Sequence, residues 1–459
     1  MKSALRLTKL IENAGMDAVH LTSNPEITGL AEDSRRVETG FLFTAICGTQ
    51  TDGTKYIRDA LARGASAIVM GVGTKLAIET DVPLIMVPDP RRASALLAGG
   101  FYSSQPSGIA AVTGTNGKTS VASFLRQIWS SKGVQAASLG TLGLESPGLV
   151  AGSWSKELSA LTTPGPVLLH RALDFLASNG IQKVAIEASS HGLDQRRMDA
   201  VRVRHAGFTN LTRDHEDYHG SMASYLSAKL RLFDAVMEPG SVAVLNRNSN
   251  VFNEIQEVCK GKGHEIIHYG NSLDGRLTDG IDLLERKSRG IGFFAQLHFG
   301  GEIKAVNVPL TGQFQEENIM CSLGLAIAGA RYLCASAQPH IVAGFHLDPV
   351  LVEAIDRLAF QDIKPVFHHM GFGKRDNGTR FEGDDGHMHV MTQVFRRDET
   401  GGCPLAVCPR HFGRLDLFFV RYECIRGSQS LDCFVGFSDP VKPDWSIGRI
   451  FDRPGTTGR

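Results

Sequence analysis

Residues 109–119 of the chain read Ile-Ala-Ala-Val-Thr-Gly-Thr-Asn-Gly-Lys-Thr, and this stretch decides the fold. Its first four residues are apolar and predict a buried strand. Apolar residues that recur every three or four positions afterwards predict an amphipathic helix from Thr119 to about Gly133. A glycine-rich turn between such a strand and helix can wrap its backbone N–H groups around phosphate oxygens, while the helix N-terminus adds positive potential.

The loop Thr-Gly-Thr-Asn-Gly-Lys-Thr, residues 113–119, is a variant of the general phosphate-loop pattern GxxxxGK[ST]. That pattern requires glycine at position 112, where this chain has Val112. The variant keeps Lys118, which can reach terminal phosphates, and Thr119, whose hydroxyl can ligate Mg²⁺. An ordinary glycine-rich turn is the alternative, but it does not account for the agreement of strand, loop and helix. We therefore predict a nucleoside triphosphate site.

The surrounding sequence predicts an α/β fold. β-branched runs at 184–189, 206–212 and 242–246 are separated by helix-length segments, which favours a mostly parallel sheet with helices on both faces. Residues 1–106 alternate short apolar runs with helical stretches and predict a separate small α/β domain. Residues 107–330 form the predicted central phosphate-loop domain. Ligands of such sheets bind beyond the carboxyl ends of the strands.

Dense polar runs follow two of the predicted strands. Glu187 begins the run 187–197, and a carboxylate at a strand end in a phosphate site is a suitable Mg²⁺ ligand, although an ordinary salt bridge is the alternative. The run 209–220 contains His215 among several charged groups, which favours a site over a scaffold role. The spacing around Lys229, taken alone, predicts only a lysine on a helix surface.

Composition excludes several broad classes. Lys and Arg together number 48, as do Asp and Glu, so the formal net charge is zero and gives no whole-chain argument for nucleic-acid or membrane binding. We find no apolar run long enough for a membrane span and no secretory leader, and we expect a cytoplasmic protein. The eight cysteines include no CxxC pair and are expected to be reduced thiols. We expect a monomer by default.

The last part of the chain, residues 331–459, has a different character. It holds seven of the 16 histidines and five of the eight cysteines and shows little strand–helix rhythm. We treat it as an atypical C-terminal region. The spacings His368-His369, His387-x-His389 and Cys403-x4-Cys408 do not favour a compact tetrahedral metal site.

Together the motifs resemble the Mur ligase family. They are TGTNGKT (113–119), TTP (162–164), EASSHGLDQRR (187–197), TNLTRDHEDYHG (209–220) and AK (228–229). DSR (33–35) and GTQTDG (48–53) resemble the UDP-binding domain of the subgroup that adds the third residue of the peptidoglycan stem peptide. The resemblance covers about residues 20–329. A folate-polyglutamate or cyanophycin-type ligase is an alternative that fits DSR and SSHGLDQRR less well.

The resemblance implies an ATP-dependent amide ligase that adds a diamino acid, meso-diaminopimelate, to UDP-N-acetylmuramoyl-L-alanyl-D-glutamate through an acyl phosphate. The residues implied to bind ATP are Gly114, Thr115, Asn116, Gly117, Lys118, Thr119, Ser120 and, near the adenine, Asn246. Those implied to hold Mg²⁺ are Thr119, Glu187, His215 and Lys229, the last as a carbamylated lysine. The catalytic residues implied are Lys118, Lys229 and His215.

The muramoyl-dipeptide is implied to contact Thr162, Thr163, Ser189, Gln195 and Arg197. The uridine diphosphate pocket is implied at Ser34, Thr49, Gln50 and Thr51. One departure is Glu32, where close relatives often carry an apolar residue before DSR. The pattern Leu-x-Gly-x-Phe-x-x-x-Asn is kept at 310–318, but the family's later motifs, including the one that selects diaminopimelate, are absent.

Two hypotheses follow for the unmatched region. Residues 331–459 are a frame-shifted or foreign reading attached to two authentic domains, which the other reading frames of the gene would test. Alternatively, the chain is a catalytically impaired remnant that binds nucleotide and UDP-muramoyl-peptide without a working amino-acid domain. Phosphate release that depends on an added amino acid distinguishes an active ligase from such a remnant.

Overall fold

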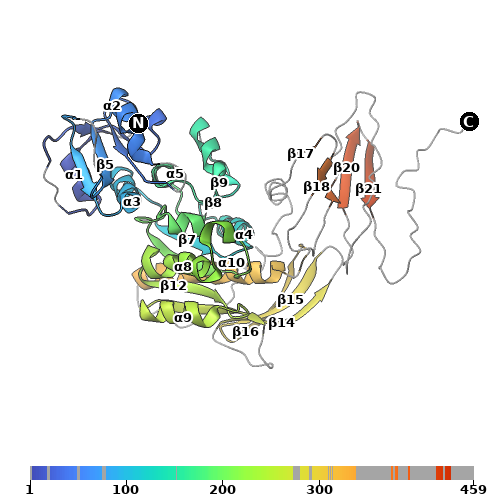
Figure 1. Cartoon of the computed structure of the whole chain (residues 1–459). Coiled ribbons are helices and arrows are strands. Elements are labelled where there is room, and N and C mark those ends of the chain that lie inside the picture. The colour runs from blue at the N-terminus through green and yellow to red at the C-terminus, as the bar shows by residue number, and fades with distance from the viewer. Residues whose placement is uncertain are drawn as a thin grey trace, which may run out of the picture. The chain divides into compact units, whose positions relative to one another are not determined.

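The computed structural model divides the chain into two compact units (Figure 1). The structure describes residues 3–17, 21–48, 52–74, 79–150, 152–271, 280–288, 292–308, 310, 312 and 314–337. In the last part of the chain, only the strand residues 374–375, 378–380, 391–392, 420–426 and 429–435 are described. Everything that positions the predicted site lies in the first unit, which contains residues 1–288 and 292–363.

The amino-terminal part contains a four-stranded parallel sheet in the order β3-β4-β5-β6. Its strands are β3 (Gly29–Ala31), β4 (Phe41–Thr44), β5 (Ala67–Gly71) and β6 (Leu84–Val87). A short antiparallel pair, β1 (Leu5–Arg6) and β2 (Glu26–Ile27), precedes it. Its helices are α1 (Leu7–Asn13), α2 (Ile57–Ala62) and α3 (Pro90–Phe101), with 3-10 turns η1 (Ser34–Arg36) and η2 (Gly53–Tyr56).

The central part is a ten-stranded sheet in the order β16-β15-β14-β13-β12-β11-β7-β10-β8-β9. The seven strands from β14 to β8 in this order are parallel, whereas β9, β15 and β16 pair antiparallel at the two ends. The strands are β7 (Gly108–Thr113), β8 (Ala136–Gly140), β9 (Gly143–Glu145), β10 (Lys183–Glu187), β11 (Val203–Phe208), β12 (Met237–Asn246), β13 (Glu265–Asn271), β14 (Ile281–Ser288), β15 (Phe293–Phe299) and β16 (Glu302–Val308).

Helices cover both faces of the central sheet. They are α4 (Lys118–Ser131), α5 (Pro166–Ser178), α6 (Ser190–Asp194), α7 (Glu216–His219), α8 (Met222–Arg231), α9 (Phe252–Gly261) and α10 (Phe314–Ala337), with η3 (Ser153–Ala160) and the π-helical turn η4 (Leu232–Val236). Along β7, Ala110 and Val112 join one buried cluster while Ile109 and Ala111 join the other, so the central strand is apolar on both faces.

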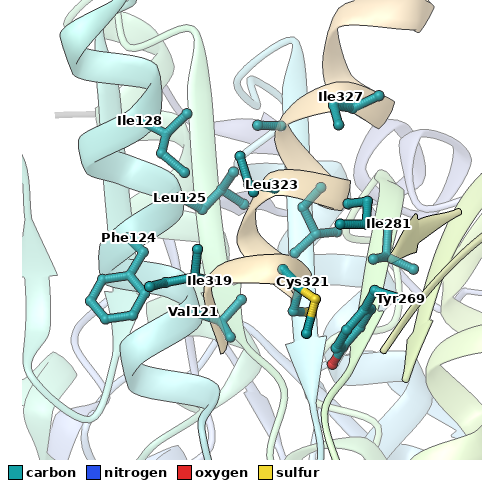
Figure 2. Packing of buried hydrophobic residues seen from close by; sticks show 14 of the residues in the cluster. Val121, Phe124, Leu125, Ile128, Tyr269, Ile281, Ile319, Cys321, Leu323 and Ile327 are labelled. Atoms are coloured by element: carbon teal, nitrogen blue, oxygen red, sulfur yellow. The ribbon is translucent and has the colours of Figure 1, made fainter. Parts of the chain in front are cut away.

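The first of these clusters joins α4 to α10. Figure 2 shows Leu125 of α4 beside Leu323 of α10, and Tyr269 of β13 beside Cys321. These side chains are almost completely buried. The phosphate-loop helix is therefore fixed between the sheet and a second helix from 200 residues later in the chain.

The predicted α/β class and the mostly parallel central sheet are confirmed. β7 and α4 lie within one residue of the expected strand 109–113 and helix start. β11 ends at Phe208, so the run 206–212 is half strand and half loop, because Asn210 and Thr212 hydrogen-bond the phosphate loop instead of a neighbouring strand. The antiparallel strands β9, β15 and β16 were not predicted.

The second unit contains two small antiparallel sheets among its described residues. One has the order β17 (Lys374–Arg375), β18 (Gly378–Arg380) and β19 (Met391–Thr392), and the other pairs β20 (Val420–Arg426) with β21 (Gln429–Val435). The histidine and cysteine spacings considered for a metal module all lie outside the described residues. No helix in the described part of the chain is long and apolar enough to cross a membrane.

Candidate functional site

The phosphate loop is shaped by two glycines that other residues could not replace. Gly114 has φ +145° and Gly117, which precedes α4, has φ +88°. A Cβ atom on Gly114 would collide with the Thr209 side chain, and one on Gly117 would collide with Asn318. The loop thus needs glycine for both its backbone angles and its close neighbours.

Two lysines converge on the same backbone carbonyl. Lys118 Nζ donates to Gly114 O at 2.9 Å and to Thr115 O at 2.7 Å. Lys229 Nζ, from α8, donates to Gly114 O at 2.7 Å and lies 4.3 Å from the centre of the Tyr225 ring. Lys229 is 1% exposed, so the surface lysine predicted from spacing alone is wrong. The position that the resemblance singled out lies against the phosphate loop.

Burial changes the ionisation of both lysines. Desolvation lowers the pKa of Lys118, while Glu187 and Asp214 oppose this effect. The pKa of Lys229 is lowered well below its usual value, first by burial and second by the positive charge of Lys118. Both causes favour the neutral amine of Lys229, which is the nucleophilic form.

Glu187 ends β10, and its carboxylate is held by Thr119 in the first turn of α4 and by Thr141, which follows β8. Thr119 Oγ1 donates to Glu187 Oε2 at 2.8 Å, and the Thr141 N–H and hydroxyl donate to Oε1 and Oε2 at 2.9 and 3.2 Å. Burial raises the pKa of Glu187, with Lys118 as the main opposing charge. The donors described for the Glu187 carboxylate are thus hydroxyl and backbone groups, and they place it against the first turn of α4.

The segment after β11 is tied to the phosphate loop by reciprocal hydrogen bonds. Thr209 Oγ1 donates to Asn116 O at 2.6 Å, and Asn116 N donates to Asn210 Oδ1 at 3.0 Å. Thr212 N donates to Thr115 Oγ1 at 3.0 Å. The loop 113–119 and the start of the run 209–220 are therefore one structure, in which the later segment holds the conformation of the earlier one.

His215 lies in a group of rings beside this structure. It adopts φ +52° and is exposed, with Asp214 Oδ2 3.5 Å from its Nε2. Its ring is 4.9 Å from that of His191 and 6.1 Å from that of Tyr225, the ring that Lys229 also contacts. The structure thus brings the predicted ligands His215 and Lys229 to one tyrosine.

Four predicted muramoyl-peptide residues form a connected chain of hydrogen bonds. Thr163 Oγ1 donates to Glu187 O at 2.8 Å and is 3.0 Å from Ser189 Oγ. Arg197 donates to Thr163 O and to Gln195 Oε1, both at 2.7 Å. This chain begins at the backbone of Glu187, so the predicted peptide and nucleotide residues are adjacent.

The remaining predicted residues are distributed as follows. Thr162 accepts a hydrogen bond from Thr141 at 3.2 Å and so joins the Glu187 group. Ser120 lies in the first turn of α4. Ser34 is buried in the amino-terminal part, where its hydrogen bond lowers the pKa of Asp59. Thr49, Gln50 and Thr51 lie outside the described residues.

Asn246 is buried, and its side chain bonds within the protein. Its Nδ2 donates to Thr209 O at 2.7 Å and to Glu317 Oε2 at 3.0 Å, and its Oδ1 accepts from Asn248 N at 2.9 Å. Asn246 therefore connects the end of β12 to the segment after β11 and to α10. Through Thr209, which bonds to Asn116, these contacts help to hold the loop 113–119 in place.

Sequence reasoning missed Thr141 and Tyr225 as contributors to the site. Thr141 follows the short strand β8 at the same sheet edge as Glu187, and a polar residue after an apolar strand was the available signal. Tyr225 OH donates to Thr115 Oγ1 at 3.3 Å, but an isolated tyrosine in a helix gives no such indication.

The residues around Glu187 fit a Mg²⁺ ion that is bound mainly through phosphate. Among the described residues, no three His, Cys, Asp or Glu side chains are grouped so as to hold a metal by themselves. Mg²⁺ commonly uses one or two protein oxygens, several waters and the phosphates of its nucleotide. The pair Thr119–Glu187, 2.8 Å apart beside a glycine cradle, is a donor set of this kind.

Comparison with known proteins identifies similar sequences over the same region. Residues 112–326 match the family model described as Mur ligase middle domain, and residues 26–102 match that described as Mur ligase family, catalytic domain. Together these matches cover more than half of the chain. They end shortly before the predicted boundary at residue 330.

Two curated relatives carry the name UDP-N-acetylmuramoyl-L-alanyl-D-glutamate–2,6-diaminopimelate ligase. The protein of Bradyrhizobium diazoefficiens is 48% identical over 302 residues, 66% of this chain and 60% of the relative. That of Rhizobium meliloti is 44% identical over 303 residues, with the same coverage. This chain spans about 60% of the length of these relatives.

A solved structure of a protein with the same name is similar to this fold. Its TM-score is 0.63 at 26% sequence identity, and the alignment covers 84% of this chain and 70% of that one. The structural similarity therefore agrees with the sequence matches.

Proposed function

Residues 26–326 of the chain belong to the Mur ligase family, and we propose that the protein is an ATP-dependent amide ligase. Its proposed reaction joins a diamino acid, meso-diaminopimelate, to UDP-N-acetylmuramoyl-L-alanyl-D-glutamate in peptidoglycan synthesis. The names of the relatives support this substrate pair. The observation that carries the proposal is the convergence of Lys118 and Lys229 on Gly114 O, together with the bond from Thr119, next to Lys118 in the chain, to Glu187.

The chemistry explains why such a site is needed. A carboxylate is a poor electrophile until one of its oxygens becomes part of a leaving group. In the proposed reaction, the γ-phosphoryl group of ATP is transferred to the D-glutamyl carboxylate, the amine then attacks the acyl phosphate, and phosphate leaves. Both reactants of the first step are anions, so positive groups must bring them together.

The phosphate loop supplies these groups. Backbone N–H groups of residues 114–119 bind phosphate oxygens at the N-terminus of α4. Lys118 exchanges its two carbonyl acceptors for the terminal phosphates, which strengthens its bonds because the new acceptors are charged. Asn116 and Ser120 flank these contacts, and Asn246 supports the adenine side of the site through Thr209 and Glu317.

Thr119 and Glu187 hold Mg²⁺, and His215 and Lys229 hold a second ion. Bound Mg²⁺ offsets the charge of the transferred phosphoryl group. We propose that Lys229 is carbamylated: its neutral amine adds to CO₂ and loses a proton, giving an anionic oxygen ligand. Support comes from the burial of Lys229 and from its lowered pKa.

The muramoyl-dipeptide is proposed to lie along the residues that connect Glu187 to Arg197. These are Thr162, Thr163, Ser189, Gln195 and Arg197. Ser34 and Thr49 to Thr51 are proposed to bind the uridine diphosphate. ATP and nucleotide-linked precursors are cytoplasmic compounds, and we place the protein in the cytoplasm for that reason.

We propose the domain plan 1–106 for UDP binding, 107–330 for ATP binding and 331–459 as an atypical region after them. The test is phosphate release from ATP and Mg²⁺ in the presence of the UDP-muramoyl dipeptide, with and without diaminopimelate, lysine or ornithine. Release that requires diaminopimelate supports the ligase. Binding of nucleotide and dipeptide without amino-acid-dependent release would instead identify the impaired remnant.

A further inference from the structure

Glu32 places a carboxylate at the edge of the proposed peptide site. It follows β3 in the amino-terminal part and is partly buried. Ser94 Oγ of α3 donates to Glu32 Oε1 at 2.8 Å. On the other side, a Cβ atom added to Gly165 would lie 3.2 Å from Glu32 Oε2. The carboxylate is therefore held between α3 and the segment that begins at Thr162.

Two cations act on this carboxylate without contacting it. Arg197 and Arg91 are the charges that lower the pKa of Glu32, but the hydrogen bonds described for these two guanidinium groups go to other acceptors. The Arg197 guanidinium donates to Thr163 O and Gln195 Oε1, and Arg91 donates to Cys47 O at 3.0 Å. Space between opposite charges in a ligand site can be filled by a polar group of the ligand.

No other charged group is described as acting strongly on Glu32. In its own segment, Asp33 is bonded to the guanidinium of Arg35. The segment 162–165 contributes hydroxyl and backbone groups only. Burial is the largest influence on Glu32 and raises its pKa, so this carboxyl accepts a proton more readily than an exposed one.

We propose that Glu32 is a specificity-determining residue of the muramoyl-peptide site. In the free protein, its carboxylate offsets the positive charges of Arg197 and Arg91. When an anionic peptide binds, Glu32 takes up a proton from solvent. This inference rests on the proposed function, because it requires the UDP-muramoyl dipeptide to bind beside Arg197. The carboxylate of the peptide then replaces that of Glu32 as the partner of the arginines.

The physical reason is the repulsion between like charges. Two carboxylates that share one partly buried arginine cannot both remain ionised without a free-energy cost. Protonation of Glu32 removes this cost and leaves a hydroxyl that can donate a hydrogen bond to the ligand. The site consequently distinguishes ligands by the number of carboxylates that they bring to Arg197.

The test is titration calorimetry of the full chain with UDP-N-acetylmuramoyl-L-alanyl-D-glutamate in buffers of different ionisation enthalpy, at about pH 7. We expect uptake of a substantial fraction of one proton, approaching about one, and tighter binding as the pH is lowered. In Glu32→Gln, which can still accept the Ser94 hydrogen bond, we expect no proton uptake and about tenfold tighter binding.

The matched control is Glu38→Gln, which removes the same charge from an exposed position in the same part of the chain. The second ligand is UDP-N-acetylmuramoyl-L-alanine, which has one carboxylate fewer and should gain less affinity from Glu32→Gln. Equal proton uptake in the unaltered protein and in Glu32→Gln would overturn this inference alone. Absence of dipeptide binding to the unaltered protein would overturn the proposed function and this inference with it.

Discussion

The Nζ atoms of Lys118 and Lys229 donate to the same acceptor, Gly114 O, at 2.9 and 2.7 Å, although the two residues lie in different helices. Burial is the main cause that lowers the pKa of Lys229, and the positive charge of Lys118 lowers it further. This arrangement therefore favours a charged Lys118 in the phosphate loop and a neutral amine on Lys229 behind it.

Lys229→Ala should abolish phosphate release, and formate or acetate should partly restore it by supplying the missing carboxylate oxygens. The direct measurement is carbon NMR of protein equilibrated with ¹³C-bicarbonate. We expect a carbamate signal in the unaltered protein and none in Lys229→Ala. A control with Lys156→Ala, an exposed lysine, should keep both the signal and the activity. An unchanged carbamate signal in Lys229→Ala would refute the assignment.

Lys118→Met should reduce ATP-dependent phosphate release by about 10³-fold or more, since the only side-chain cation of the loop is lost. Met keeps most of the apolar stem, so the change in the free energy of unfolding should be within about 1 kcal/mol. Phosphate release and thermal denaturation measure the two effects. Turnover equal to that of the control Lys156→Met would exclude Lys118 from the nucleotide site.

Glu187→Gln should remove the Mg²⁺ dependence of nucleotide binding. The amide can keep the hydrogen bond from Thr141 N–H but cannot supply a charged oxygen to the ion. We expect ATP to raise the melting temperature of the unaltered protein more with Mg²⁺ than with EDTA, and equally in both for Glu187→Gln. The comparison is Glu157→Gln, which breaks only an exposed ion pair with Arg36. A remaining Mg²⁺ effect in Glu187→Gln would contradict the prediction.

His170 should make the fold sensitive to acid. It is buried against Asp199 O, and burial lowers its pKa from 6.5 to about 4. Between about pH 6.5 and 4, His170 is therefore protonated in the unfolded chain but neutral in the folded protein. The free energy of unfolding is consequently unaffected by His170 above about pH 6.5 and falls as the pH drops towards 4. The loss is up to about 3 kcal/mol. His170→Gln should show a smaller fall in denaturant titrations between pH 7 and 4.5, and an equal fall would refute the assignment.

Local patterns predicted much of the fold because each acts over a few residues. The apolar run before Gly114 and the periodic residues after Lys118 were sufficient to place β7 and the start of α4 within a residue. Glu187 was expected near the loop because parallel strands bring their carboxyl ends to one edge. The antiparallel ends of the sheet were missed, since β15 and β16 have no motif that distinguishes them from further parallel strands.

The site was harder to predict from the sequence where its contacts involve residues that are distant in the chain. The periodicity around Lys229 indicates only a helix; its burial is due to Tyr225 and the carbonyl of Gly114, 115 residues earlier. Likewise, the bonds from the Asn246 amide to Thr209 and Glu317 were not expected, and its assignment to the adenine side by resemblance stays a prediction. Sequence spacing carries no information about such pairings until the sheet order is known.

The close approach of Gly114 to Thr209 and of Gly117 to Asn318 bears on how this loop could be redesigned. The strand, loop and helix are contiguous in sequence and look like a cassette that could be exchanged between proteins. They are shaped, however, by side chains that lie about 95 and 200 residues further along. A graft of residues 108–131 alone would bring the loop without the two side chains that define its shape, so successful chimeras must transfer positions 209 and 318 as well.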